Sequence, residues 1–208
     1  DTADQFLSSA REAGYNYIIP GASEFMFGVE TAVRFSENDR YPRFISANLV
    51  DAKTRRMLFE PYATWYVSGL RICIIAFSDT SISKQIRGGT LKGIDIMTYD
   101  ETLTALSVPV AREHADIVIA AGRFDRAAVF DIARKHPYVD MFLTNSQSGG
   151  FADAKGATTN ALVSGKSLFV GSEEGTKLGM LALKEVGGIE TREFSTITLG
   201  DAFPPDKE

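Results

Sequence analysis

Apolar and polar residues recur along this chain with two periods, and each period predicts a type of element. Helical spacing of Phe6, Leu7, Ala10 and Ala13 predicts an opening helix that stops at Gly14. Further helices are expected over residues 29–35, 100–113 and 125–135. Strands are expected over residues 15–19, 44–49, 57–62, 64–67, 71–77, 117–121, 139–143, 161–163, 167–170, 177–185 and 191–199. Alternating strands and helices followed by a strand-rich end predict a mixed α/β fold.

Length and composition limit the class of protein. The 208 residues, 44% hydrophobic and 24% charged, suit one globular domain over residues 1–208, with 199–208 as a terminal tail. A net charge of −5 argues against nucleic-acid binding, which needs clustered Lys and Arg. No apolar run reaches the roughly 18 residues of a membrane-spanning helix.

Residues that usually carry out catalysis are scarce. The two histidines, His114 and His136, fall near the ends of predicted helices, where a cation is favourable. The single cysteine, Cys73, lies among isoleucines in a predicted strand and is expected to be a buried, inert thiol. Neither a Gly-x-Ser-x-Gly nor a Gly-x-Gly-x-x-Gly motif occurs. In such folds the chemistry is expected in loops after the carboxyl ends of strands.

One extended pattern is more specific. Gly14-Tyr15-Asn16-Tyr17, Gly21-Ala22-Ser23-Glu24-Phe25 and Gly28 follow one another around a short predicted strand. Matching segments continue at residues 46–49, 58–62, 69–76, 116–120, 139–143, 171–179 and 204–206. In order and spacing they resemble the calcineurin-like metallophosphoesterases of the 5′-nucleotidase type. The resemblance implies a layered α/β sandwich, and in that family two metal ions activate water and polarise a phosphate.

The departures from the family pattern fall on its metal-binding motifs. The family's Gly-Asn-His-Glu has its metal-ligand Asn and its His replaced by Ala22 and Ser23, and only Glu24 is kept. A ligand His is expected near Gly122, and the two His of Gly-His-Ser-His fall on Ser146 and Ser148. A serine hydroxyl replaces imidazole poorly on a transition metal. The family's first two motifs would precede the matching region, so the fold is expected to be N-terminally shortened. The sequence leaves open whether the chain is a processed piece, a shortened variant that covers the open edge differently, or a domain to which a partner chain adds strands.

These losses predict a catalytically inactive domain, without metal or other cofactor, that has a structural or partner-binding role. Its partner, another protein or a second copy, is expected at a sheet edge left open by the shortening. One alternative is a phosphoester hydrolase with a rearranged site. Another is a module that binds a small anion or nucleotide through residues 144–150. Carboxylates considered for a Mg²⁺ or Ca²⁺ site are Glu24, Asp79, Asp125 and Asp153. The resemblance also suggests a periplasmic or extracellular location.

Overall fold

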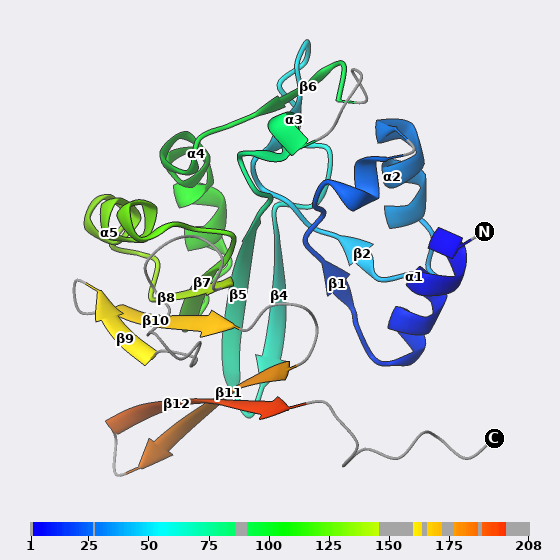
Figure 1. The fold of residues 1–208 in the computed structure, drawn as a ribbon. Coiled ribbons are helices and arrows are strands. Elements are labelled where there is room, and N and C mark those ends of the chain that lie inside the picture. Colours follow the sequence, from blue (N-terminus) through cyan, green and yellow to red (C-terminus); the bar gives the residue numbers. More distant parts are fainter. Residues whose placement is uncertain are drawn as a thin grey trace, which may run out of the picture. The chain divides into compact units, whose positions relative to one another are not determined.

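The structure of this chain is a computed structural model. It describes residues 2–26, 28–85, 91–145, 160–163, 166–171, 177–186 and 189–198. The chain divides into two compact units, Asp1–Gly122 and Arg123–Glu208. Both units mix helices and strands, as expected for the α/β class (Figure 1). The single domain over residues 1–208 stays a prediction, and its tail, residues 199–208, lies outside the described residues.

The first unit contains three small sheets. Its helices are α1 (Thr2–Glu12), η1 (Ser23–Phe25), α2 (Val29–Ser36), α3 (Ile82–Gln85) and α4 (Tyr99–Arg112). Its strands are β1 (Tyr17–Ile18), β2 (Arg43–Phe44), β3 (Leu49–Asp51), β4 (Tyr62–Val67), β5 (Leu70–Phe77), β6 (Ile94–Ile96) and β7 (Ile117–Gly122). β1 pairs with β2 in parallel, β3 pairs with β6 antiparallel, and β5 lies between antiparallel β4 and parallel β7.

The β4–β5 hairpin has a two-residue turn whose backbone requires positive φ. Ser68 and Gly69 have φ values of 50° and 86°, the combination typical of a type I′ turn. The turn makes Val67 and Leu70 partners. The backbone groups of Trp65 and Ala63, which alternate with it along β4, therefore also form hydrogen bonds with β5. Alternate residues Thr64 and Tyr66 then direct their backbone N–H and C=O away from β5.

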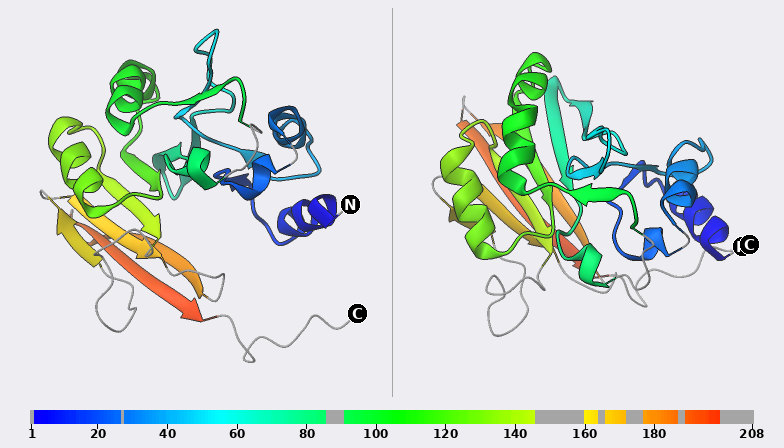
Figure 2. Two further views of the ribbon diagram at one scale, coloured as in Figure 1. Left: turned by 45° about the horizontal axis from the view of Figure 1, so that its top comes forward. Right: turned by 90° about the horizontal axis from the view of Figure 1, so that it is seen from above.

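Two apolar clusters lie on opposite sides of the β1–β2 pair. Helices α1 and α2 lie on one side of these strands (Figure 2). There the cluster includes Leu7 of α1, Ala32 of α2 and Phe44 of β2. On the other side, Ile45, Ala63 and Ala76 are buried, and Tyr17, Ile19 and Trp65 pack against them while remaining partly exposed. The second cluster has fewer buried members than the first, which also has partly buried hydrophobic neighbours.

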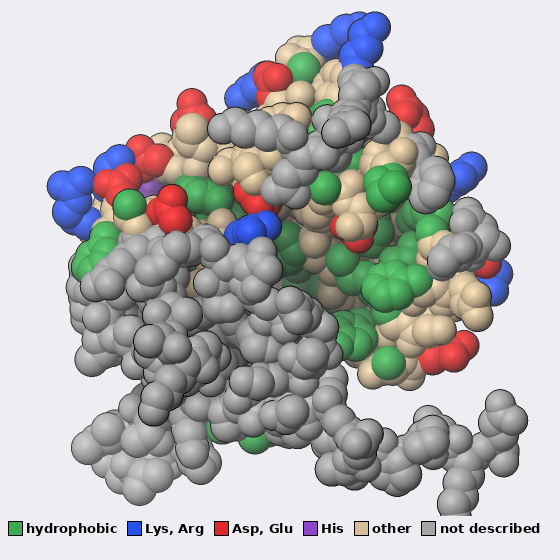
Figure 3. Space-filling view, in the orientation of Figure 1, with side chains coloured by type: hydrophobic (Ala, Val, Ile, Leu, Met, Phe, Trp, Pro, Cys, Tyr) green, Lys and Arg blue, Asp and Glu red, His purple; other side chains and the backbone are tan. Residues whose placement is uncertain are grey.

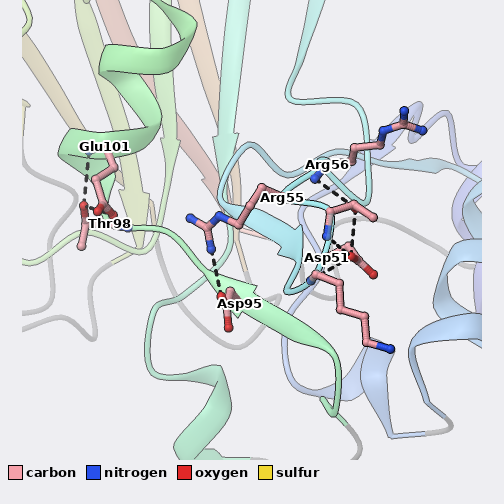
Figure 4. Close-up of polar contacts among 8 residues, drawn as sticks. Asp51, Arg55, Arg56, Asp95, Thr98 and Glu101 are labelled. Carbon is pink, nitrogen blue, oxygen red and sulfur yellow. Dashed lines mark hydrogen bonds and ion pairs between the residues drawn. The ribbon is translucent and has the colours of Figure 1, made fainter.

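A polar corner of the first unit orders the start of α4 (Figure 4). The Thr98 hydroxyl accepts from the Glu101 amide at 3.2 Å, and the Glu101 carboxylate accepts from the Thr98 amide at 3.0 Å. This reciprocal capping box satisfies two amides that have no partner within the helix. The Thr98 hydroxyl also donates to this carboxylate at 2.8 Å, and this bond, followed by the bond from the amide, lowers the pKa of Glu101. Nearby, the Arg55 guanidinium pairs with Asp95 of β6 at 2.9 Å.

The second unit begins with a short turn and α5 (Arg126–Lys135), followed by β8 (Met141–Asn145), β9 (Asn160–Val163), β10 (Lys166–Gly171), β11 (Lys177–Val186) and β12 (Ile189–Thr198). β10 lies between parallel β8 and antiparallel β9. β11 and β12 form a long antiparallel pair. Under α5, Phe124 packs edge-to-face on Phe142 with ring centroids 6.3 Å apart, so these two rings form part of this unit's core.

The structure corrects two strand predictions. Residues 44–49 do not form one strand, because β2 ends at Phe44 and β3 begins at Leu49. Between them the buried polar Ser46 and Asn48 bond to other segments instead of a strand ladder. Residues 57–62 make only isolated bridges before β4 begins at Tyr62. η1, α3 and β6 were not predicted, because each is only three or four residues long.

The described helices include none that is long and apolar enough to cross a membrane.

Cys73 is fully buried in β5, as predicted, and burial raises the pKa of its thiol to about 12. We therefore expect the native protein at pH 8 to resist alkylation by iodoacetamide, whereas the denatured chain takes up one label. Mass spectrometry counts the labels, and rapid labelling of the native protein would contradict the burial.

The raised pKa also predicts a pH dependence of stability. Since the thiol of the unfolded chain ionises first, the free energy of unfolding, measured by urea denaturation, should fall as the pH rises from 9 towards 12.

Candidate functional site

Three segments meet at the carboxyl end of β5, in the region where the sequence placed the candidate site. Ser78 follows β5, and its hydroxyl donates to the carbonyl of Pro20 at 2.8 Å, directly before the 21–24 loop. Phe77 is the register partner of Gly122 at the end of β7. Ala22, Ser23, Glu24 and Gly122 are thus brought to one edge of the first unit.

A buried network of polar side chains holds this meeting point. The Asn48 carboxamide accepts from the Ser78 amide and donates to the Ser78 carbonyl, both at 2.9 Å. The Ser46 hydroxyl lies 3.1 Å from Asn48 Oδ1 and 3.0 Å from Ser78 Oγ. All three residues are at most 1% exposed. Since buried polar groups are stable only with partners, this network fixes the backbone that carries the site loops.

Glu24, the retained acid of the motif, contributes to the shape of its own loop. One carboxylate oxygen, Oε2, accepts from the Gly21 amide at 2.6 Å, across the turn that leads into η1. Ser23 is exposed, and Ala22 and Glu24 are half-buried. The loop therefore has a methyl group, a hydroxyl and a carboxylate with one hydrogen-bonded oxygen, in the order in which the family motif has an amide, an imidazole and a carboxylate.

The other candidate carboxylates begin helices. Asp79 Oδ1 accepts from the Ser81 amide at 2.8 Å, ahead of α3. Asp125 Oδ1 accepts from the Ala128 amide at 2.7 Å and caps α5. Among the residues that the structure describes, no three His, Cys, Asp or Glu side chains form a group that could hold a metal ion. The donor set at Ala22, Ser23, Glu24 and Gly122 does not fit a pair of metal ions, because Ala and Gly supply no donor.

The remaining candidate positions belong to the second unit. β8 ends at Thr144 and Asn145, directly before Ser146 and Ser148. The Thr144 hydroxyl accepts from the Phe124 amide at 3.0 Å and so holds the end of β8 against the segment that follows β7. Ser146, Ser148 and Asp153, with most of the predicted 144–150 loop, lie outside the described residues.

The histidines lie at helix ends, as predicted. His136 is the C-cap of α5 and only 6% exposed, and its ring packs edge-to-face on Tyr138 at 6.0 Å. His114 follows α4 with a positive φ of 51°, and its side chain is exposed. Neither belongs to the loops that meet at Ser78.

The comparisons with known proteins agree with this geometry. No family model matches the sequence. A 5′-nucleotidase of Vibrio cholerae serotype O1 is 26% identical over 119 residues, 57% of this chain and 21% of the relative. The sulfate thiohydrolase SoxB of Thermus thermophilus superposes with a TM-score of 0.74 at 16% identity, over 91% of this chain and 34% of that structure. The calcineurin-like phosphoesterase YfkN of Bacillus subtilis gives 0.71 at 20% identity, over 94% and 67%.

This chain has the calcineurin-like metallophosphoesterase fold of the 5′-nucleotidase type. A 5′-nucleotidase of Thermus thermophilus supports the same fold, with a TM-score of 0.68 at 18% identity over 91% of this chain and 40% of that structure. The chain spans about a fifth of its curated relative and about a third of SoxB. Its relatives are thus phosphoesterases and nucleotidases that extend well beyond the matched region.

Sequence reasoning located the 21–24 loop and Gly122 but overlooked the Ser46–Asn48–Ser78 network. Ser46 and Asn48 fall only within the matching segment 46–49, and Ser78 belongs to none of the matching segments. The signal was available: a Ser-x-Asn pair interrupts an otherwise apolar run that reads as a strand. Polar residues inside such a run indicate a buried hydrogen-bonding role.

Replacing Asn48 by Ala should strongly destabilise the first unit. The variant leaves the buried amide and carbonyl of Ser78 without their side-chain partner, which typically costs about 2–4 kcal/mol in free energy of unfolding. Urea denaturation followed by circular dichroism measures this. Asn38→Ala is the matched control, because Asn38 makes one exposed hydrogen bond, to the Arg40 amide. Equal stabilities of the two variants would contradict the role of the network.

Proposed function

We propose that this chain is a phosphoesterase-fold domain that does not hydrolyse phosphoesters and acts by binding another protein. The observation that supports this most directly is the donor set of the loops that meet at Ser78. Ala22 and Gly122 supply no ligand, and Ser23 supplies only a hydroxyl. One carboxylate oxygen of Glu24 already accepts a hydrogen bond from the Gly21 amide. Hydrolysis in this fold depends on metal ions that orient water and polarise phosphate, and these side chains do not replace that function.

The scaffold around these positions is nevertheless buried and hydrogen-bonded. The buried network at Asn48 and Ser78 keeps the site loops together although their ligating groups are gone. Fold and activity are separable in this way, because activity depends on a few side chains while the fold depends on the packed interior. The preserved interior favours a structural or binding role for the domain.

The hydrolase alternative needs carboxylates that act together. Asp79 and Asp125 each accept an amide hydrogen bond at the start of a helix, and Glu24 accepts one within its own loop. These bonds favour local structural roles for all three acids. An anion site at Ser146 and Ser148 has no further observation in its favour among the described residues.

Metal content and hydrolysis test the first half of the proposal. After incubation with Mn²⁺ and removal of excess metal, we expect elemental analysis to find far less than one metal ion per chain. Hydrolysis of p-nitrophenyl phosphate and of AMP should stay at the level of the buffer. The matched variants Glu24→Gln and Glu30→Gln should behave alike. One or two metal ions per chain, with turnover that Glu24→Gln abolishes and Glu30→Gln keeps, would refute inactivity.

The proposed contact region is the outer edge of β4. β4 lies at the edge of its sheet, with β5 as its neighbour, and Thr64 and Tyr66 turn their backbone groups outwards. At its end, Tyr66 is 72% and Val67 52% exposed. A six-residue edge strand with exposed apolar side chains is a template for pairing with another extended segment.

Site-specific photo-crosslinking tests the second half. A benzophenone side chain placed at Tyr66 should give a discrete protein adduct in cells of the native source. The same group at Phe6, which is 63% exposed on α1, should not give it. Adducts that are identical from both positions, or absent from position 66, would remove β4 as the contact edge. The metal and hydrolysis measurements are independent of this outcome.

A further inference from the structure

A hollow in the first unit lies near the starts of β1 and β2, whereas the loops at Ser78 lie at the end of β5. It has a volume of about 350 Å³ and opens beside β1, β2 and β4. Tyr17 begins β1, Arg43 begins β2, and Trp65 is the partner of Ile72 near the start of β5. In the space-filling view, hydrophobic side chains gather at the surface alongside β1 (Figure 3). The lining residues are Arg11, Asn16, Tyr17, Asp39, Tyr41, Arg43, Thr64 and Trp65.

One part of the lining is aromatic and already ordered. Tyr17 and Trp65 meet edge-to-face with ring centroids 5.0 Å apart, and both remain partly exposed. Tyr41 is 5% exposed, is held by Asp4 through its hydroxyl and packs edge-to-face on Phe35 at 5.7 Å. Partly exposed rings held in this way offer a surface for another planar group at little cost in conformational entropy.

The other part of the lining carries two guanidinium groups. Arg11 Nη1 donates to Asn16 Oδ1 at 3.0 Å, and Arg43 Nη1 donates to Glu60 Oε1 at 3.1 Å. These bonds restrain each side chain but use one nitrogen of a group that has five N–H donors. The bond from Arg43 to Glu60 is an ion pair, and the lining itself contains one carboxylate, Asp39. Guanidinium groups and aromatic rings in one lining can together recognise an anion joined to a ring.

We propose that this hollow binds a small aromatic anion. The ring of the ligand lies against Tyr17 and Trp65, and its carboxylate or phosphonate group lies between Arg11 and Arg43. This site is separate from the loops at Ser78, and it depends neither on catalytic inactivity nor on a partner at β4. Ligand size is limited by the volume of the hollow, which is at the lower end for small-molecule pockets.

The sequence offers a direct probe, because Trp65 is the only tryptophan of the chain. Titration of the full chain with phenylphosphonate, excited at 295 nm, should give a saturable change in tryptophan fluorescence. Arg11→Gln and Arg43→Gln should each weaken the apparent affinity by about tenfold or more, since each removes a charge-assisted contact. Arg134→Gln is the matched control, because Arg134 is exposed and forms one ion pair, with Asp131, in the second unit; its affinity should equal that of the unmodified chain.

Two matched probes separate the parts of the proposal. Methylphosphonate carries the anion without the ring, and benzyl alcohol carries the ring without the anion. Each should bind at least tenfold more weakly than phenylphosphonate. Binding of methylphosphonate as tight as that of phenylphosphonate would refute the role of the rings. A linear, unsaturated response to phenylphosphonate, or arginine variants that bind like the unmodified chain, would refute the site. Circular dichroism of each variant verifies the fold.

Discussion

The arrangement of the first unit depends on the hydrogen bonds made by the side chain of Asn48. Its carboxamide satisfies both backbone groups of Ser78, while the Ser78 hydroxyl reaches the carbonyl of Pro20. Next to it, the Ala47 amide donates to the Ala76 carbonyl at 2.7 Å. A few buried hydrogen bonds thus join the β1–β2 pair, the loop after β1 and the end of β5. Removing any partner would leave a buried polar group unsatisfied, which makes the arrangement specific.

This network separates the residues that shape the site loops from the residues at the candidate site positions. Ala22 and Gly122 supply no metal-binding group and Ser23 supplies only a hydroxyl, and none of the three makes the bonds of the network. Positioning depends on Ser46, Asn48 and Ser78, which make their bonds within the protein. We therefore expect substitution at Ala22 or Ser23 to change the free energy of unfolding little, whereas substitution in the network should lower it strongly. Because the two sets of residues differ, the fold does not depend on the chemistry of the site.

The first unit also has contrasting sides. One side of β1 and β2 is packed under α1 and α2, where Phe59 makes a tilted contact with Phe25 and an edge-to-face contact with Phe44. The other side has a small buried cluster whose neighbours Tyr17 and Trp65 stay partly exposed. Apolar rings that remain at the surface next to Arg11 and Arg43 are thermodynamically favourable places for a ligand or partner, because covering them removes apolar area from water.

The sequence alone was enough for the longer elements. α1, α2, α4 and α5 follow from apolar spacing and capping residues, and β5 and β7 from continuous apolar runs, because these signals are local. It also predicted, through the resemblance, which residues stand where that family has its ligands, since the identity of a residue needs no geometry. Only the tertiary structure decided that residues 44–49 are divided between two strands, because the side chain of Asn48 bonds to Ser78, which is distant in sequence. Likewise, Arg11, Arg43 and Trp65 line one hollow only because α1, β2 and β4 pack together. Such long-range pairings leave no periodic signal along the chain.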